Sequence, residues 1–389
     1  MMDCQQLKQK IKQICEENMS QFEEIGEYIF LHPENGYEEF ESSKYLEDVL
    51  EQEGFQVRRG YKGLPTSFKA TWGKGKTKIA FLPEYDALPG YGPNKDQMAH
   101  ACGHNWISAS CLGAAICLKK ILSEKDATLV VIGTPAEETY GGKCVLVKEG
   151  AFDEIDYVFQ MHLGTKNLLR PQTQAMDSIE FEFFGKPSHA ALAPEEGINA
   201  LDAVLLMFNG VNARRAHCPK STSIAGIITK GGSACNIVPD HTACQFYIRD
   251  KNREAVDQLN KMMIEIAKGA CKMTGARMEY RFFENSFDEL CNDEKLVRIM
   301  ENNLRDLGIN QFDEKEELGG SSDIGNVSKV AKTMYFEMAT GKEIFAHEEE
   351  FLDLVHGENA KKTLHDAIVA MAWSALDVIE DGKLKNKKG

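Results

Sequence analysis

The segment Ile79-Ala-Phe-Leu-Pro-Glu-Tyr-Asp-Ala-Leu-Pro89 joins a short apolar run to a polar stretch that begins at Pro83. A short apolar run that ends at a proline is typical of a buried strand. Apolar runs at 128–133 and 157–161 have the same form, and helical patterns at 106–122 and 142–149 precede or separate them. This alternation predicts an α/β fold, with a mixed, mostly parallel sheet sandwiched by helices.

Metal-capable side chains follow each of these apolar runs. Asp86 follows the first, Glu137 and Glu138 follow the second within Thr134-Pro-Ala-Glu-Glu-Thr139, and His162 follows the third. In an open parallel sheet, ligands bind beyond the carboxyl ends of the strands. We therefore expect residues that are distant in sequence to converge at this edge.

A different pattern begins near Met176, where apolar and acidic residues alternate as they do in a half-exposed strand. A helix at 198–213, strands at 221–229 and 242–249, a helix at 253–273 and a strand at 278–283 should follow. This βαββαβ order predicts an inserted α+β domain with an antiparallel, ferredoxin-like sheet.

The rest of the chain should complete the first domain. We expect one amphipathic helix over 5–30, helices over 293–307 and 358–379, and a strand over 333–338. The expected organisation is a catalytic domain at 1–175 and 289–389 with the insert at 176–288. A length of 389 residues also favours two domains, because single cores seldom grow that large.

The charge balance restricts the partners. Lys and Arg number 45 against 60 Asp and Glu, a net charge of −15 that disfavours nucleic acid and anionic membrane surfaces. The N-terminal residues lack the basic-then-apolar order of a secretion signal, so we expect a cytoplasmic protein. The eleven cysteines include no Cys-x-x-Cys pair and are expected to be reduced, with Cys111, Cys117 and Cys244 packing as small hydrophobes.

The run His100-Ala-Cys-Gly-His-Asn105 offers a thiol and an imidazole two residues apart, at Cys102 and His104. Both are metal ligands, and glycine between them lets the backbone approach an ion closely. The alternative is a buried thiol beside two surface histidines. A cysteine-nucleophile hydrolase that uses Cys102 with His104 is a second alternative.

The adjacent carboxylates Glu137 and Glu138 would repel each other unless a nearby cation offsets their negative charges. One carboxylate can then ligate a metal while the other takes a proton from water. A solvated acidic turn is the competing interpretation. A lone histidine such as His162 is more often a core residue, but its place at a strand end favours a ligand. Asp86 either orients a ligating imidazole or forms a turn before Pro89.

Taken together, these segments resemble the co-catalytic metallopeptidase superfamily of aminoacylase and carboxypeptidase G. The match is strongest to its amidohydrolase branch, with aminobenzoyl-glutamate hydrolase-like and dipeptidase-like members. The resemblance spans nearly the whole chain and also includes Gly185-Lys-Pro-Ser-His-Ala190, Asn236-Ile-Val-Pro-Asp240, Gly320-Ser-Ser-Asp-Ile-Gly-Asn-Val-Ser328 and His347. Asn105 stands where many members of this branch have Asp, which points away from auxin conjugates and simple acyl amino acids as substrates.

The resemblance implies a set of site residues. Two divalent ions, Zn²⁺ foremost with Mn²⁺ also tolerated, would be held by Cys102, His104, Glu138, His162 and His347. Glu137 would be the general base and acid. The resemblance also makes the insert a lid and homodimerisation domain whose His189 reaches a partner's active site, with the substrate carboxylate held by Asn236, Arg249, Gly319 and Gly320.

From sequence alone, these residues also allow ordinary structural roles. His189 could cap a turn, Asn236 could be a turn residue, Arg249 could pair with a surface acid, and His347 could be an exposed histidine among acids. The expected reaction is hydrolysis of an amide between an acyl or aminoacyl group and an amino acid with a free carboxylate, as in a dipeptide or aminobenzoyl-glutamate. A catalytically silent relative that only binds or assembles is the remaining alternative.

Overall fold

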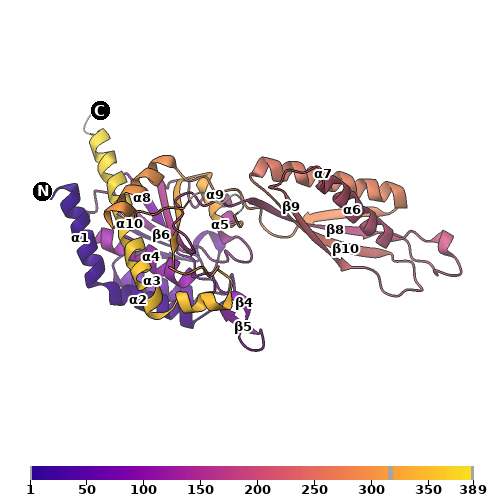
Figure 1. The fold of residues 1–389 in the computed structure, drawn as a ribbon, viewed down its shortest axis with the longest axis horizontal. Helices are drawn as coiled ribbons and strands as arrows, with labels where there is room; N and C mark the ends of the chain where they lie inside the picture. The colour runs from indigo at the N-terminus through magenta and orange to yellow at the C-terminus, as the bar shows by residue number, and fades with distance from the viewer. Residues whose placement is uncertain (1, 314–318, 387–389) are drawn as a thin grey trace. The chain divides into compact units, whose positions relative to one another are not determined.

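A computed structural model describes residues 2–313 and 319–386 (Figure 1). The chain forms two compact units. The first comprises Met1–Gln172, Leu290–Glu317 and Asn326–Gly389, and the second comprises Thr173–Glu289 and Leu318–Gly325. The short stretch 319–325 thus packs with the second unit, although it lies after the insert in sequence.

The first unit is built on a six-stranded sheet with the order β1-β2-β6-β3-β7-β12. Its strands are β1 (Gln56–Arg59), β2 (Phe68–Gly73), β3 (Lys78–Phe81), β6 (Thr128–Ile132), β7 (Tyr157–Gly164) and β12 (Lys332–Ala339). The last four in spatial order are parallel, whereas β1 and β2 form an antiparallel edge. The mixed, mostly parallel sheet expected from the sequence is confirmed. A separate hairpin pairs β4 (Leu88–Tyr91) with β5 (Gln97–Ala99).

Helices flank this sheet. They are α1 (Cys4–Glu17), α2 (Met19–Leu31), α3 (Phe40–Gln52), α4 (His104–Lys119), α5 (Gly142–Lys148), α8 (Glu294–Asp306) and α10 (Lys361–Asn386). The short helix α9 (Ile324–Ser328) contains the division between the two units, which falls after Gly325. The expectation of one helix over 5–30 is wrong, because α1 ends at Glu17, with Asn18 as its C-cap, and α2 begins at Met19. The Asn18 side chain donates to the Ile14 carbonyl at 2.7 Å, a local bond that competes with continued helix.

The core of the first unit is centred on α4. Nearly every residue of this helix is buried, and Cys111 and Cys117 are fully enclosed. A helix that is apolar all round belongs inside a protein. All eleven cysteines are free thiols, and Cys111, Cys117 and Cys244 pack in the hydrophobic cores, as expected.

The second unit is a four-stranded antiparallel sheet with the order β11-β8-β10-β9 and two helices. Its elements are β8 (Ala175–Phe184), α6 (Ala200–Arg215), β9 (Ser223–Lys230), β10 (His241–Asp250), α7 (Arg253–Thr274) and β11 (Arg277–Phe282). Phe181, Phe183 and Phe246 form the core between the sheet and the helices. The order and pairing confirm the ferredoxin-like insert.

Among the described residues, no helix combines the length and the apolar character that crossing a membrane requires.

Close packing between α2 and α4 yields a stability prediction. A Cβ added to Gly26 would lie 2.8 Å from two ring carbons of the buried Trp106. We expect Gly26→Ala to lower the free energy of unfolding by about 1–3 kcal/mol, measured by urea denaturation. Gly382→Ala in α10 is the matched control. Its Cβ would meet only the Thr77 hydroxyl, at 3.3 Å, so it should be neutral or slightly stabilising. Equal effects of the two substitutions would contradict this packing.

Candidate functional site

The carboxyl ends of the parallel strands deliver polar side chains to one edge of the first unit's sheet. Glu84 and Asp86 follow β3, and Glu137 and Glu138 follow β6. His162 lies near the end of β7, opposite Glu337 of β12. Strands far apart in sequence therefore bring these groups to a common edge, as the parallel arrangement requires.

The start of α4 contributes two further groups. Gly103 adopts φ 78° as the N-cap of α4, and a Cβ there would lie 3.0 Å from Leu163. A left-handed conformation favours glycine at this position. Cys102 and His104 flank it, and both are buried. The turn thus directs a thiol and an imidazole from neighbouring positions into the same buried region.

Side-chain distances define a compact cluster. Cys102 Sγ lies 3.3 Å from His162 Nε2, and Glu138 Oε1 lies 3.7 Å from His104 Nε2. Among the described residues of the first unit, potential ligand atoms fall into three groups, each with all its atoms within 4.8 Å of one another. These groups are Cys102 with His104 and His162, Cys102 with Glu138 and His347, and His104 with Glu137 and Glu138.

His347 reaches this cluster from a loop after β12. Its Nε2 lies 3.4 Å from Glu138 Oε1. The backbone of His347 has φ 76°, and its N–H donates to the Ala101 carbonyl at 2.7 Å. Tyr91 donates its hydroxyl to the His347 carbonyl at 2.8 Å. These backbone bonds hold a strained conformation that places the imidazole beside Glu138.

The donor set fits a divalent cation. His104 Nε2 and Glu138 Oε1 are buried and have no hydrogen-bond partner among the described residues, although buried polar atoms are almost always paired. His104 Nδ1 lies 2.9 Å from Asp86 Oδ1, so a proton on Nδ1 leaves Nε2 as the electron-pair donor. A carboxylate behind a ligating histidine is the usual support in metal sites.

The electrostatics agree with a cation-binding role. Burial, together with the charge of Glu138, raises the pKa of the Cys102 thiol well above its usual value. A nucleophilic cysteine needs the opposite shift, so the site does not favour the cysteine-nucleophile alternative. Burial opposes ionisation of Glu138, yet the imidazoles of His347, 3.4 Å away, and His104 lower its pKa to about 2. A carboxylate ready for ligation thus lies beside a thiol that a cation would ionise.

Sequence reasoning assigned no role to Glu84 and Lys143. Glu84 and Lys143 form a buried ion pair, and Glu84 Oε2 lies 3.6 Å from His104 Nε2. Burial opposes ionisation of Glu84, but the ammonium group of Lys143 and the nearby histidines lower its pKa. Its position directly after β3 was a usable signal, since Asp86 was selected for the same reason.

Glu39 is a second residue that sequence reasoning missed. It is fully buried at the start of α3, where its oxygens accept hydrogen bonds from Ala136 N at 2.8 Å and Thr66 Oγ1 at 2.7 Å. Burial and the charge of Asp86 raise the pKa of Glu39 to about 7. No strand end or spacing in the sequence marks it.

Asn105, by contrast, is part of the packing. It is buried, and its side-chain amide donates to Val355 O at 2.8 Å and Gly26 O at 3.3 Å. These bonds tie the first turn of α4 to α2 and to the segment at 355.

The remaining predicted residues lie in the second unit. His189 is exposed, and its Nδ1 accepts the Ala191 and Leu192 amides at 3.3 Å, as a turn-capping histidine would. It forms a β-bridge with Ile237, next to the exposed Asn236. The Arg249 guanidinium lies 5.2 Å from the Tyr247 ring centre, so its contact is with an aromatic ring. Gly320 accepts Gln174 N at 2.8 Å, and Gly319 precedes it.

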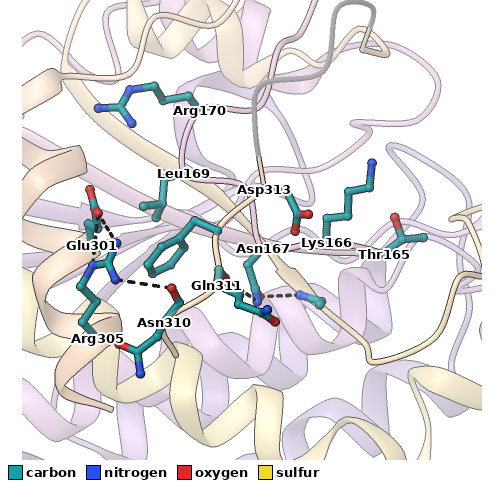
Figure 2. A pocket seen from close by; sticks show the side chains of 12 residues that line it. Thr165, Lys166, Asn167, Leu169, Arg170, Glu301, Arg305, Asn310, Gln311 and Asp313 are labelled. Carbon is teal, nitrogen blue, oxygen red and sulfur yellow. Dashed lines mark hydrogen bonds and ion pairs between the residues drawn. The ribbon is translucent and has the colours of Figure 1, made fainter. Parts of the chain in front are cut away.

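Another pocket of the first unit, of about 1000 Å³, contains none of the predicted ligands (Figure 2). It is lined by residues that follow β7, by α8 and by the segment 310–313. Its arginines are already paired, Arg170 with Glu294 and Arg305 with Glu301. The pocket therefore lacks the groups that the chemistry at the strand ends requires.

A thiol, imidazoles and a carboxylate gathered at the strand ends, with a second carboxylate beside them, are the groups of a metal-dependent hydrolase. The chain belongs to peptidase family M20/M25/M40, whose family model matches residues 80–370. As a member of this family, it is a metallopeptidase or amidohydrolase that acts on C–N amide bonds.

Individual relatives extend over most of the chain. The human Xaa-Arg dipeptidase is 31% identical over 393 residues, covering 93% of this chain and 88% of the relative. One polypeptide of the Escherichia coli p-aminobenzoyl-glutamate hydrolase is 32% identical, covering 77% of this chain and 64% of the relative. A Bacillus subtilis dinuclear metal binding peptidase of the M20 family shares the fold with a TM-score of 0.69 and 21% identity, covering 93% of this chain and 99% of the other.

The cluster predicts a difference between two buried thiols. We expect Cys102→Ala to lose at least part of the bound divalent metal, measured by elemental analysis after dialysis, because a soft ligand is removed. Cys111→Ala is the matched control, since Cys111 is equally buried in α4 and lies outside the three ligand groups. Full metal content in Cys102→Ala would contradict the assignment.

Proposed function

We propose that this protein uses two divalent cations to hydrolyse an amide between an acyl or aminoacyl group and an amino acid with a free carboxylate. The observation that supports this proposal most directly is the pair Glu137 and Glu138 after β6. Glu138 lies among the cation ligands, and Glu137 shares a 4.8 Å group with Glu138 and His104. The ligand and the proton acceptor are therefore adjacent in the chain.

The substrate class follows from what the relatives' names have in common. They act on Xaa-Arg dipeptides, p-aminobenzoyl-glutamate and N-acetyl-L-cysteine. In each compound the amine side of the amide is an amino acid with a carboxylate. We infer the same class for this chain, with the acyl side left open.

Cys102, His104, Glu138, His162 and His347 would hold the cations, which supply Lewis acidity and lower the pKa of water. The mixed thiol, imidazole and carboxylate set suits Zn²⁺, and its imidazoles and oxygen donors also suit Mn²⁺. Glu137 accepts the proton of the attacking water and later delivers it to the leaving amine nitrogen. Asp86 keeps the His104 ring oriented throughout.

We infer that the second unit is a lid and dimerisation domain. Its exposed His189 would reach the active site of a partner copy and donate to the carbonyl oxygen as negative charge develops there. Asn236, Arg249 and the backbone at Gly319 and Gly320 would bind the substrate carboxylate. A neutral amide and a planar guanidinium are suitable carboxylate donors.

The role of Glu137 is tested by exchanging its carboxylate for an amide. We expect Glu137→Gln to keep its metal but lose turnover by at least about 100-fold, because the isostere cannot accept the proton. Turnover would be measured on dipeptides, acyl amino acids and aminobenzoyl-glutamate, with metal content in parallel. Glu138→Gln is the matched control and should lose metal as well. Substantial activity in Glu137→Gln would rule out the general-base role.

The shared active site is tested by complementation. His189→Ala should retain metal yet be nearly inactive, because an oxyanion donor is removed. Mixing it with inactive Glu137→Gln protein should restore part of the activity, since a heterodimer contains one site with both residues intact. The mixture would be assayed after subunit exchange has been demonstrated by mass spectrometry. No recovery under those conditions would argue against a site shared between subunits.

A further inference from the structure

The backbone just before Glu137 is strained. Ala136 has φ 58°, a left-handed conformation that residues with a Cβ rarely adopt, and it is fully buried. Such conformations persist only where the surroundings enforce them, and they concentrate at functional sites. The contacts that hold Ala136 therefore help to determine where Glu137 points.

Hydrogen bonds fix the peptide groups on both sides of Ala136. Its carbonyl accepts the amides of Tyr140 at 3.2 Å, Gly141 at 2.8 Å and Gly142 at 3.3 Å. Its own N–H donates to Glu39 Oε1 at 2.8 Å. The carbonyl bonds are local to the loop, whereas the N–H bond is made to a different part of the chain. Glu39 is thus the external anchor of this turn.

Glu39 occupies the N-cap position of α3 but makes no side-chain capping bond to that helix. Glu34 does so instead, since its two oxygens accept the Glu41 and Ser42 amides, each at 2.9 Å. The Glu39 carboxylate is left to bind Ala136 and Thr66. Burying a carboxylate is unfavourable, and burial raises the pKa of Glu39, so the two hydrogen bonds, rather than a charge, are the contribution of this side chain.

Two buried carboxylates hold the backbone on either side of Glu137. Glu39 accepts the amide of Ala136, the residue before it, and Asp86 Oδ2 accepts the amide of Glu138, the residue after it, at 2.9 Å. The carboxylate of Glu137 is therefore carried by a segment pinned at both neighbouring peptides. Catalytic groups need this fixation, because small displacements reduce rates steeply.

We propose that Glu39 is a positioning residue for Glu137, holding the Ala136 peptide in the left-handed turn that aims the general base at the cation site. This inference rests on the proposed function of Glu137. Glu39 is outside the groups of potential ligands and acts through its hydrogen bond to the Ala136 backbone. Its contribution should appear in kcat more than in KM.

The test measures kcat, KM and metal content in three variants. Glu39→Ala should reduce kcat by about 100-fold while metal and KM are retained. Glu39→Gln should keep most of the activity, because the amide oxygen can still accept from Ala136 and the amide nitrogen can donate to Thr66. Glu34→Ala is the matched control, a carboxylate of the same loop that caps α3. It should lower stability without lowering kcat.

A rescue experiment separates positioning from general loosening. Adding Ala136→Gly to Glu39→Ala should recover kcat by about tenfold, because glycine adopts the left-handed turn without the steric penalty. Because glycine at positive φ also raises stability, kcat is compared well below the unfolding temperature of each variant, where overall stability alone does not change kcat. If Glu39→Ala does not fold, Glu39→Asp provides the same test, since it keeps the charge and withdraws the acceptor by one methylene.

Unchanged kcat in Glu39→Ala would overturn the proposal. So would a crystal structure of the metal-loaded variant in which Ala136 keeps its φ and the Glu137 carboxylate has not moved. That crystal structure decides the role of Glu39 whatever Glu137 does. Activity that persists in Glu137→Gln would instead refute the proposed function, so the two failures are distinguishable.

Discussion

One buried carboxylate, Asp86, connects the parts from which the candidate site is assembled. Its Oδ1 lies 2.9 Å from His104 Nδ1, and its Oδ2 accepts the Glu138 amide at 2.9 Å. It therefore joins the loop after β3, the first turn of α4 and the loop after β6. The ring of His104 and the backbone of Glu138, two of the proposed cation ligands, are fixed by the same group, so their spacing is set together.

This connection depends on the sheet. β3 and β6 are adjacent and parallel, with Phe81 opposite Val131 near their ends, so the two loops begin side by side. An antiparallel neighbour would send the second loop to the opposite edge. The α4 helix begins at the same edge, after the left-handed turn at Gly103. The strand order, more than any one motif, brings a thiol, imidazoles and carboxylates within reach of one cation.

Periodicity and strand ends were sufficient to predict the parallel sheet, the ferredoxin-like insert and the grouping of Cys102, His104 and Glu138. The break at Asn18 was missed, because apolar spacing continues across it while a side-chain bond ends the helix. His347 was predicted only through the family resemblance, since its approach depends on a strained loop anchored at Ala101. Glu39 gave no signal, because a carboxylate whose partner is a backbone amide nearly a hundred residues away leaves no spacing pattern.

The burial of charged and polar groups explains why this cluster is better suited to binding a cation than to packing without one. Glu84 is compensated by Lys143, and Glu138 lies beside His347 and His104. His104 Nε2 and Glu138 Oε1 nevertheless lack hydrogen-bond partners in the part of the chain that the structure describes, and burial keeps the Cys102 thiol protonated. A buried polar atom without a hydrogen bond lowers the stability of the fold, because its lost contact with water is not replaced. A divalent cation would satisfy both atoms and convert the thiol to thiolate, so metal binding and local stability are linked in the first unit.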